Sequence, residues 1–337
     1  MRFVEICVCA LVDLVRRRLR PLRHDVATGT LRFPAIDLCP RAAAPRRSLA
    51  NRVNQLTKPY SIRVFVPAGD PEGIRIIEKS NWSGSGLVIP RALFAEGRKR
   101  KELTRTGVYV LAGPPEDSGL PRVYVGEGDP IRPRLEQHAT KKDFWTTCFA
   151  FSSKDENLNK AHAQYLESRL VELASQAKRC SLDNGTVPTQ PSMSEADAAD
   201  AEGFLSEILL CFPVLGLGVF STAAPTVGGR PLFVSAKGVK AEGRETAEGF
   251  VVRAGSTVVK DETPSCHAHL TELRAALANN GVLKSTASGF VFAQDYVFSS
   301  PSTAAGVVLG RSSNGRTSWK DKVGQTLREI QESEATS

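Results

Sequence analysis

Residues 107–128 read GVYVLAGPPEDSGLPRVYVGEG and carry two mirrored runs, GVY at 107–109 and YVG at 124–126. Both runs belong to segments in which β-branched and aromatic residues alternate, as they do in strands. The sequence PPEDSGLP separates the two segments, so the stretch predicts a β-hairpin with a longer loop. Such a hairpin places Tyr109 and Tyr124 on adjacent strands, where cross-strand pairing can bring their hydroxyl groups to the same edge of the sheet.

The residues after the hairpin predict the other elements of an α+β domain. DPIRPRLEQHA (129–139) predicts a short helix, because proline is tolerated near a helix start, and FWTTCFAFSS (144–153) predicts a third strand. Residues 156–177 predict a long amphipathic helix, since their apolar residues recur at helical spacing. A further helix over 194–212 closes the unit. We therefore predict a domain over residues 106–220 with the order β-β-α-β-α and a trailing helix.

The residues before the hairpin divide into two segments. SIRVFVP (61–67) and GIRIIEK (73–79) alternate around a turn sequence, and a strand and a helix opened by Pro90 follow, so residues 58–105 predict a β-hairpin and helix leader. Residues 1–57 contain arginine and proline without sustained periodicity. For this Arg-rich leader, disorder, one short helix, an organelle transit sequence and a translation start set too early all stay open.

The net charge of +8 is unevenly distributed along the chain. Residues 1–57 hold eleven arginines, no lysine and four acidic residues, which gives +7. The remaining 280 residues hold 33 basic and 32 acidic residues, which gives +1. Any phosphate-binding surface of the body of the protein is therefore expected to be a local patch.

Cysteine usage and hydropathy indicate a cytoplasmic protein. The chain has seven cysteines and no CxxC pair, which favours reduced, mostly buried thiols. No run of about 18 apolar residues exists, so we expect no membrane-spanning helix.

Residues 107–185 resemble the GIY-YIG nuclease domain, with valine in place of isoleucine in both tripeptides. The resemblance rests on several features in order along the chain. Arg134 lies eight residues after Gly126, and His138 one helical turn further. Glu167 lies in YLESRL on the long helix, and Asn184 follows that helix in LDNGTVP. The resemblance implies a small mixed or antiparallel three-stranded sheet flanked by helices.

The resemblance also implies the chemistry of the site. Tyr109 takes the proton of the attacking water, Tyr124 and Arg134 steady the phosphate, and Glu167 anchors one Mg²⁺ or Mn²⁺. An arginine fork suits phosphate oxygens, and a single carboxylate suits an ion that keeps several waters. A nearby arginine and a metal ion are expected to lower the pKa of Tyr109 enough for it to act as a base. His138 is either a second proton carrier or a structural or substrate-contacting residue.

Four further residues are candidates for substrate contact. Gly126 and Asn184 belong to the resemblance, whereas Lys99 and Arg100 lie in the basic stretch RKRKELTR (98–105) just before the first tyrosine strand. This stretch is either a DNA-backbone contact or the charged end of a helix.

Residues 245–322 resemble a small α+β accessory domain of unknown function often found behind GIY-YIG domains, and residues 323–337 predict a charged tail. The sequence SSNGRTSWK (312–320) is either a nucleic-acid contact or a capping turn with a packed tryptophan. The main hypothesis for the whole chain is a metal-dependent endonuclease that cleaves DNA phosphodiesters. The alternative is a catalytically inactive nucleic-acid-binding or interaction module on the same fold. The sequence does not predict an oligomeric state.

Overall fold

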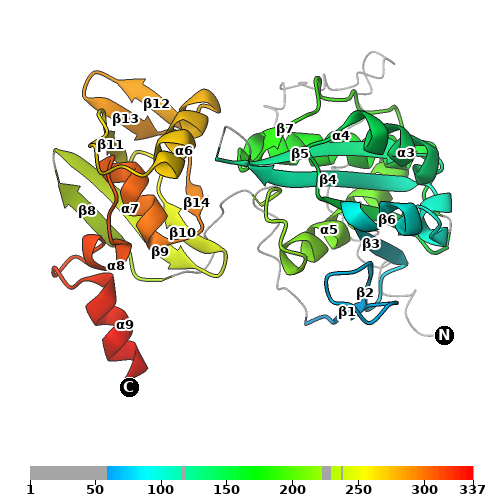
Figure 1. Cartoon of the computed structure of the whole chain (residues 1–337), viewed down its shortest axis with the longest axis horizontal. Helices are drawn as coiled ribbons and strands as arrows, with labels where there is room; N and C mark the ends of the chain where they lie inside the picture. Colours follow the sequence, from blue (N-terminus) through cyan, green and yellow to red (C-terminus); the bar gives the residue numbers. More distant parts are fainter. Residues whose placement is uncertain (1–58, 116–118, 156, 222–228, 237, 337) are drawn as a thin grey trace, which may run out of the picture. The chain divides into compact units, whose positions relative to one another are not determined.

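The computed structural model describes residues 59–115, 119–155, 157–221, 229–236 and 238–336. The predictions for residues 1–57 lie outside these ranges. The described chain is α+β, as predicted, and the tyrosine hairpin forms two neighbouring strands of its first sheet (Figure 1).

The first sheet has seven strands among the described residues, in the order β1-β2-β3-β6-β4-β5-β7. Their bounds are β1 (Ile62–Phe65), β2 (Arg75–Lys79), β3 (Gly84–Pro90), β4 (Gly107–Pro115), β5 (Pro121–Gly128), β6 (Thr147–Ser153) and β7 (Ser181–Leu182). The core β6-β4-β5 is the predicted three-stranded sheet. It is extended on one side by the three leader strands, which join through antiparallel pairing of β3 with β6, and on the other by β7.

The prediction of a three-stranded sheet was therefore too small. Strand β6 has the sequence TCFAFSS and buries residues on both of its faces. Its two edges are also both paired, one with β4 and the other with β3. The pairing of β3 satisfies the hydrogen-bonding groups that β6 would otherwise leave open at an edge. The leader strands are thus part of the domain, and residues 105 and 106 do not mark a structural boundary.

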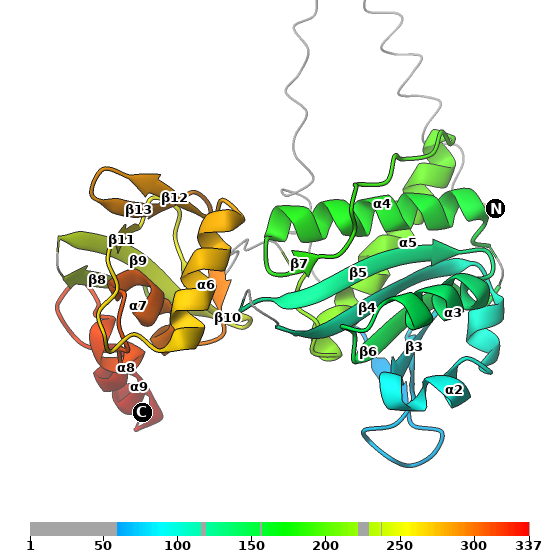
Figure 2. The same cartoon turned by 45° about the horizontal axis from the view of Figure 1, so that its top comes forward.

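Helices cover both faces of this sheet (Figure 2). Helix α3 (Ile131–Lys141) packs on one face, and α4 (Lys160–Ala177) and α5 (Glu195–Val214) pack on the other. The alternation along β4 assigns the faces, because Val108 and Val110 join the core of α4 and α5 whereas Tyr109 joins the core of α3. The order β4-β5-α3-β6-α4 matches the predicted β-β-α-β-α order.

Local sequence signals explain where these helices begin. The Asn159 side chain accepts a hydrogen bond from the backbone N–H of His162, and the backbone N–H of Asn159 donates to His162 Nδ1, which makes a capping box at the start of α4. At the start of α5, the Ser194 side chain accepts from the backbone N–H of Asp197. These caps satisfy backbone donors that the first helical turn leaves unpaired.

The helix predicted after Pro90 is instead three short turns. They are the 3₁₀ helix η2 (Arg91–Leu93), α2 (Phe94–Gly97) and the 3₁₀ helix η3 (Lys101–Thr104). Gly97 is buried against Ile89, and an added Cβ there would lie 2.5 Å from Ile89 Cγ2. This close approach holds the end of α2 against β3. The chain after α2 then forms the separate turn η3, so residues 91–104 do not form one continuous helix.

The C-terminal part contains a four-stranded sheet, β14-β10-β9-β8, and a three-stranded sheet, β11-β13-β12, among the described residues. Its strands are β8 (Leu232–Ala236), β9 (Val239–Thr246), β10 (Gly249–Val252), β11 (Thr257–Val259), β12 (Leu283–Thr286), β13 (Gly289–Phe292) and β14 (Tyr296–Phe298). Its helices are α6 (Ala268–Asn279), α7 (Pro301–Leu309), α8 (Gly315–Ser318) and α9 (Leu327–Ala335).

Both predicted limits of this domain differ from the structure. It begins at β8 rather than at residue 245, because β8 and β9 pair with each other and β9 pairs with β10. The predicted charged tail contains α9, whose Leu327 and Ile330 are buried in the same core. Only two of the nine residues of α9 are large and apolar, which is a weak periodic signal, so the sequence predicted a charged tail.

The SSNGRTSWK stretch is a packed capping turn. Asn314 caps α8 through the backbone N–H of Arg316. Trp319 is fully buried, and its indole N–H donates to the carbonyl of Pro301 at 2.9 Å. The tryptophan therefore has no free face on which a nucleic-acid base could stack. In the described part of the chain, no helix is both long and apolar enough to cross a membrane.

Candidate active site

The two tyrosines lie side by side on the α3 face of the sheet. In the register of β4 and β5, Tyr109 pairs with Gly126 and Tyr124 pairs with Leu111. The ring centroids of the tyrosines are 6.4 Å apart. Tyr109 is completely buried, whereas Tyr124 is half-buried. The hairpin thus brings the tyrosines together as expected, but in different environments.

Gly126 lies directly beneath the Tyr109 ring. A Cβ at this position would lie 2.5 Å from both Cζ and the hydroxyl oxygen of Tyr109. Gly126 is itself buried. The lack of a side chain at Gly126 thus lets the Tyr109 ring lie close against β5, and the contact of Gly126 with substrate stays a prediction.

Helix α3 brings His138 onto both tyrosines. The Tyr109 hydroxyl oxygen lies 2.6 Å from His138 Nδ1, and the imidazole meets the Tyr124 ring edge-on at a centroid distance of 4.8 Å. Burial, together with the charges of Arg134, Lys142 and neighbouring Lys141, lowers the pKa of His138 to about 4. His138 is therefore neutral at pH 7, and we assign the Tyr109 hydroxyl as the donor to Nδ1.

Burial dominates the acidity of the two phenols. It raises the pKa of Tyr109 well above the ordinary value for tyrosine, and the neighbouring Tyr124 adds to this effect. Arg134 opposes the shift but does not cancel it. Burial and Glu167 likewise raise the pKa of Tyr124 to about 12. The expected lowering of the Tyr109 pKa is therefore not produced by Arg134, and any base function of Tyr109 needs an acceptor for its own proton.

Arg134 and Glu167 face this region from opposite sides of the sheet. Arg134 lies exposed on α3, and its charge acts on both tyrosines and on Glu167. Glu167 is half-buried on α4. Within the described residues, neither side chain has a hydrogen bond or an ion pair to another residue. Both charged groups are thus available to a ligand.

Glu127 is an acidic neighbour that the sequence prediction missed. Burial and the carboxylate of Glu127 raise the pKa of Glu167 to about 7, against the opposing effect of Arg134. The alternation along β5 could have identified Glu127, because it shares the α4 face with Val125.

A divalent cation fits this carboxylate environment. A half-buried carboxylate that lacks a protein partner and lies near a second one gains from a bound cation. The described residues contain no group of three or more His, Cys, Asp or Glu side chains that could hold a metal ion. An ion at Glu167 would therefore take most of its ligands from water, as Mg²⁺ commonly does.

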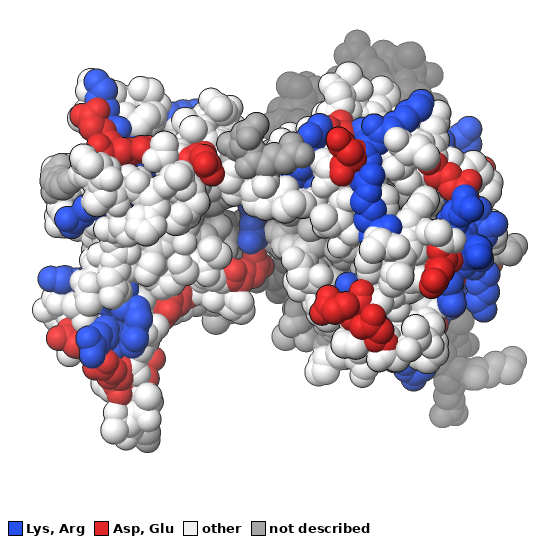
Figure 3. Space-filling view, in the orientation of Figure 1, with Lys and Arg blue, Asp and Glu red and all other residues white. Residues whose placement is uncertain are grey.

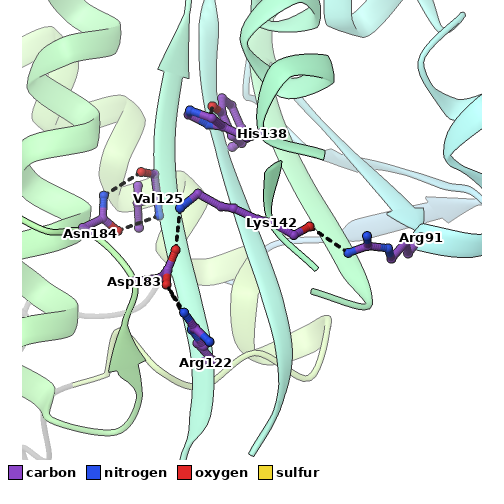
Figure 4. Close-up of polar contacts among 8 residues, drawn as sticks. Arg91, Arg122, Val125, His138, Lys142, Asp183 and Asn184 are labelled. Atoms are coloured by element: carbon purple, nitrogen blue, oxygen red, sulfur yellow. Dashed lines mark hydrogen bonds and ion pairs between the residues drawn. The ribbon is translucent and has the colours of Figure 1, made fainter. Parts of the chain in front are cut away.

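The remaining predicted substrate contacts have different surroundings. The Asn184 amide accepts from the backbone N–H of Val125 at 2.9 Å and donates to its carbonyl at 2.8 Å. Asn184 therefore continues the pairing of β5 beyond β7, and both of its polar groups are engaged (Figure 4). Arg100 forms an ion pair with Glu102 at 3.1 Å. Lys99 is exposed, so its contact with DNA stays a prediction.

Lys142 is a further cation at the site that the sequence prediction missed. Its Nζ lies 4.1 Å from the centroid of the Tyr124 ring. Arg134, His138 and Lys142 follow one another at intervals of four residues, so the helical period could have placed Lys142 on the same face. Basic side chains also gather in places on the face of this domain shown in Figure 3, next to acidic patches. This pattern agrees with the net charge of +1 counted for residues 58–337, which predicts local basic patches on a nearly neutral surface.

Comparison with known proteins describes the C-terminal domain only. A family model described as a domain of unknown function (DUF4357) matches residues 232–331, and the match begins at β8, as the structural domain does. No GIY-YIG family model matches the chain. No curated protein and no solved structure matches it at a significant level. The chain therefore carries a C-terminal region similar to a domain of unknown function, behind a domain whose site is described by its own geometry.

Proposed function

We propose that this protein is a metal-dependent endonuclease that hydrolyses DNA phosphodiester bonds at the site around Tyr109. The 2.6 Å contact between Tyr109 and neutral His138, beside two charged groups without protein partners, carries the proposal. The site thus combines a proton acceptor (His138), a cation suited to phosphate (Arg134) and a carboxylate suited to a metal ion (Glu167). DNA as the substrate rests on the resemblance of residues 107–185 to the GIY-YIG nuclease domain.

The hydrogen bond supports a proton relay rather than a free phenolate. Tyr109 is too weak an acid to lose its proton to solvent at neutral pH. In a relay, its oxygen accepts a proton from the attacking water while its own proton passes to His138 Nδ1. No phenolate then accumulates in the buried position, where charge is costly. A phosphate bound nearby favours protonated His138, because its negative charge stabilises the imidazolium.

Arg134 and Glu167 supply the remaining functions in this proposal. The Arg134 guanidinium donates to the non-bridging phosphate oxygens, on which negative charge increases during attack. Glu167 holds Mg²⁺ or Mn²⁺, which when bound stabilises charge on the phosphate and orients water. Since the pKa of Glu167 is about 7, this carboxylate becomes a good metal ligand only near and above neutral pH.

A cleavage assay tests the proposal. The full chain is incubated with duplex, flap, branched and single-stranded DNA, with Mg²⁺, with Mn²⁺ and with EDTA. Cleavage of at least one structure is expected with metal only, and Tyr109→Phe and Glu167→Gln proteins purified in parallel exclude a contaminating nuclease. DNA binding without cleavage under every condition would leave the alternative, a catalytically inactive binding module.

A further inference from the structure

The chain at the end of α3 is held by the partly exposed Arg91 of η2. Arg91 Nη1 donates to the carbonyl oxygens of Lys142 at 3.0 Å, Asp143 at 2.9 Å and Trp145 at 3.3 Å. Its guanidinium also lies 4.8 Å from the Trp145 ring centroid. Three carbonyl oxygens on one cation hold the backbone of this turn in place, and Figure 4 shows the contact of Arg91 with Lys142.

The side chain of Lys142 is fixed at its other end. Its Nζ donates to Asp183 Oδ2, and Asp183 Oδ1 accepts from Nε of Arg122 at 3.0 Å and from Nη2 of the same side chain. The Asp183 backbone N–H in turn donates to the carbonyl of Val123 at 2.8 Å. Asp183 thus ties the end of α3 to β5 across 41 residues of sequence (Figure 4).

The ion pair with Asp183 leaves part of the Lys142 ammonium group accessible. Burial alone would raise the pKa of Asp183, but the hydrogen bonds from Lys142 and Arg122 outweigh it and lower the pKa. Asp183 is therefore ionised at neutral pH and accepts hydrogen bonds from both cations. An ammonium group has three N–H donors, and Asp183 takes one of those on Lys142. The Lys142 side chain is 20% exposed, so an anion in solution can reach it.

The position of this ammonium relative to Arg134 indicates its partner. Arg134 lies on α3 and Lys142 is the residue that follows its last turn, so their backbones are about 12 Å apart along the helix axis. Successive phosphates of one DNA strand are about 3.4 Å apart along the duplex axis. The two cations therefore suit two different phosphates of one bound strand, with Tyr124 and His138 between them.

We propose that Lys142 is a second phosphate-binding cation of this site, positioned by Asp183 and Arg91, and that it binds a phosphate further along the DNA strand whose other phosphate Arg134 holds. The inference rests on the proposed function, because it takes DNA as the ligand. It adds a phosphate contact of Lys142 to the roles that the proposed function gives to Tyr109, Arg134 and Glu167.

Salt-dependent DNA binding tests this contact. Affinity for a fluorescein-labelled 20-base-pair duplex is measured by anisotropy over a series of KCl concentrations. Loss of one phosphate contact reduces the slope of log affinity against log salt by about 0.9. Lys142→Met is expected to show this loss, and Lys142→Arg to restore the wild-type slope. Lys154→Met is the matched control, because Lys154 also pairs with an acidic residue, Glu78, at 3.3 Å.

Asp183→Asn separates a ligand contact from a structural ion pair. A structural role predicts that Asp183→Asn and Lys142→Met weaken DNA binding alike. A phosphate contact predicts opposite effects, since Asp183→Asn removes a negative charge beside the ligand and is expected to leave affinity unchanged or higher. In the cleavage assay, Lys142→Met is expected to raise KM at least fivefold and to change kcat by less than threefold.

A measurement on the wild-type protein covers the case in which Lys142→Met does not fold. Lysines are acetylated with a water-soluble reagent, with and without the duplex, and quantified by mass spectrometry. DNA is expected to protect Lys142 and not Lys154. Equal acetylation of Lys142 in both samples, or a salt slope for a folded Lys142→Met equal to that of Lys154→Met, overturns the proposal. A protein that binds DNA without cutting it refutes the nuclease activity alone, because neither of these readouts requires cleavage.

Discussion

Gly126→Ala is the substitution whose effect follows most directly from the geometry of the site. The added methyl group would lie 2.5 Å from Tyr109 Cζ, whereas ordinary contacts begin at 3.4 Å. The buried ring must therefore move by about 0.9 Å, which disturbs its 2.6 Å contact with His138. Overpacking of this kind costs about 1–3 kcal/mol of unfolding free energy. A displacement of about 1 Å in a reacting group costs about 10²-fold in rate.

Two measurements on the same samples check this expectation. Urea unfolding gives the loss of stability, and single-turnover cleavage of the best DNA substrate gives the loss of rate. The control is Gly203→Ala on α5, where an added Cβ meets no atom within 4 Å. Replacing a helical glycine with alanine stabilises a protein by about 0.5–1 kcal/mol, so this variant should be more stable and equally active. A Gly126→Ala protein with wild-type stability and cleavage would refute the steric role of Gly126.

Three further substitutions test individual groups of the site. Tyr109→Phe keeps the ring and removes the relay oxygen, so cleavage is expected to fall by about 10²–10⁴-fold while thermal stability changes by only about 1 kcal/mol. Glu167→Gln should abolish metal-dependent cleavage and weaken Mn²⁺ binding measured by calorimetry. The raised pKa of Glu167 means that the native state holds a proton between about pH 4.5 and 7 that the unfolded state has lost. The ionised carboxylate therefore destabilises the fold above pH 7. Glu167→Gln should raise the unfolding free energy by about 1–2 kcal/mol at pH 8, after allowance for solvent screening, and should leave it unchanged at pH 4. Equal changes in the unfolding free energy at both pH values would contradict this cause. Asn184→Ala leaves the N–H and carbonyl of Val125 without a side-chain partner and should lower the unfolding free energy by about 1–3 kcal/mol, whereas unchanged urea unfolding would show that water replaces the amide.

The sequence by itself determined the order of elements around the site. The alternation in residues 107–128 and the helical spacing in 156–177 are local signals, because each reflects which side of one strand or helix faces a core. The structure has strands and helices at these places. Sequence order also placed Arg134 and His138 one turn apart on the same helix, and the structure shows both near Tyr109.

Only the tertiary structure decided which groups meet and how they ionise. The pairing of β3 with β6 and the contact of Lys142 with Asp183 join segments that are far apart in sequence, and no local period encodes such contacts. Burial is also a property of the packed fold. It makes Tyr109 a weaker acid and His138 a weaker base than their residue types indicate, because a charge in the core loses its hydration. The sequence therefore named Tyr109, Tyr124 and the charged residues Arg134 and Glu167 as candidates, whereas Glu127, Lys142 and the protonation states on which the proposed chemistry depends required the packing around them.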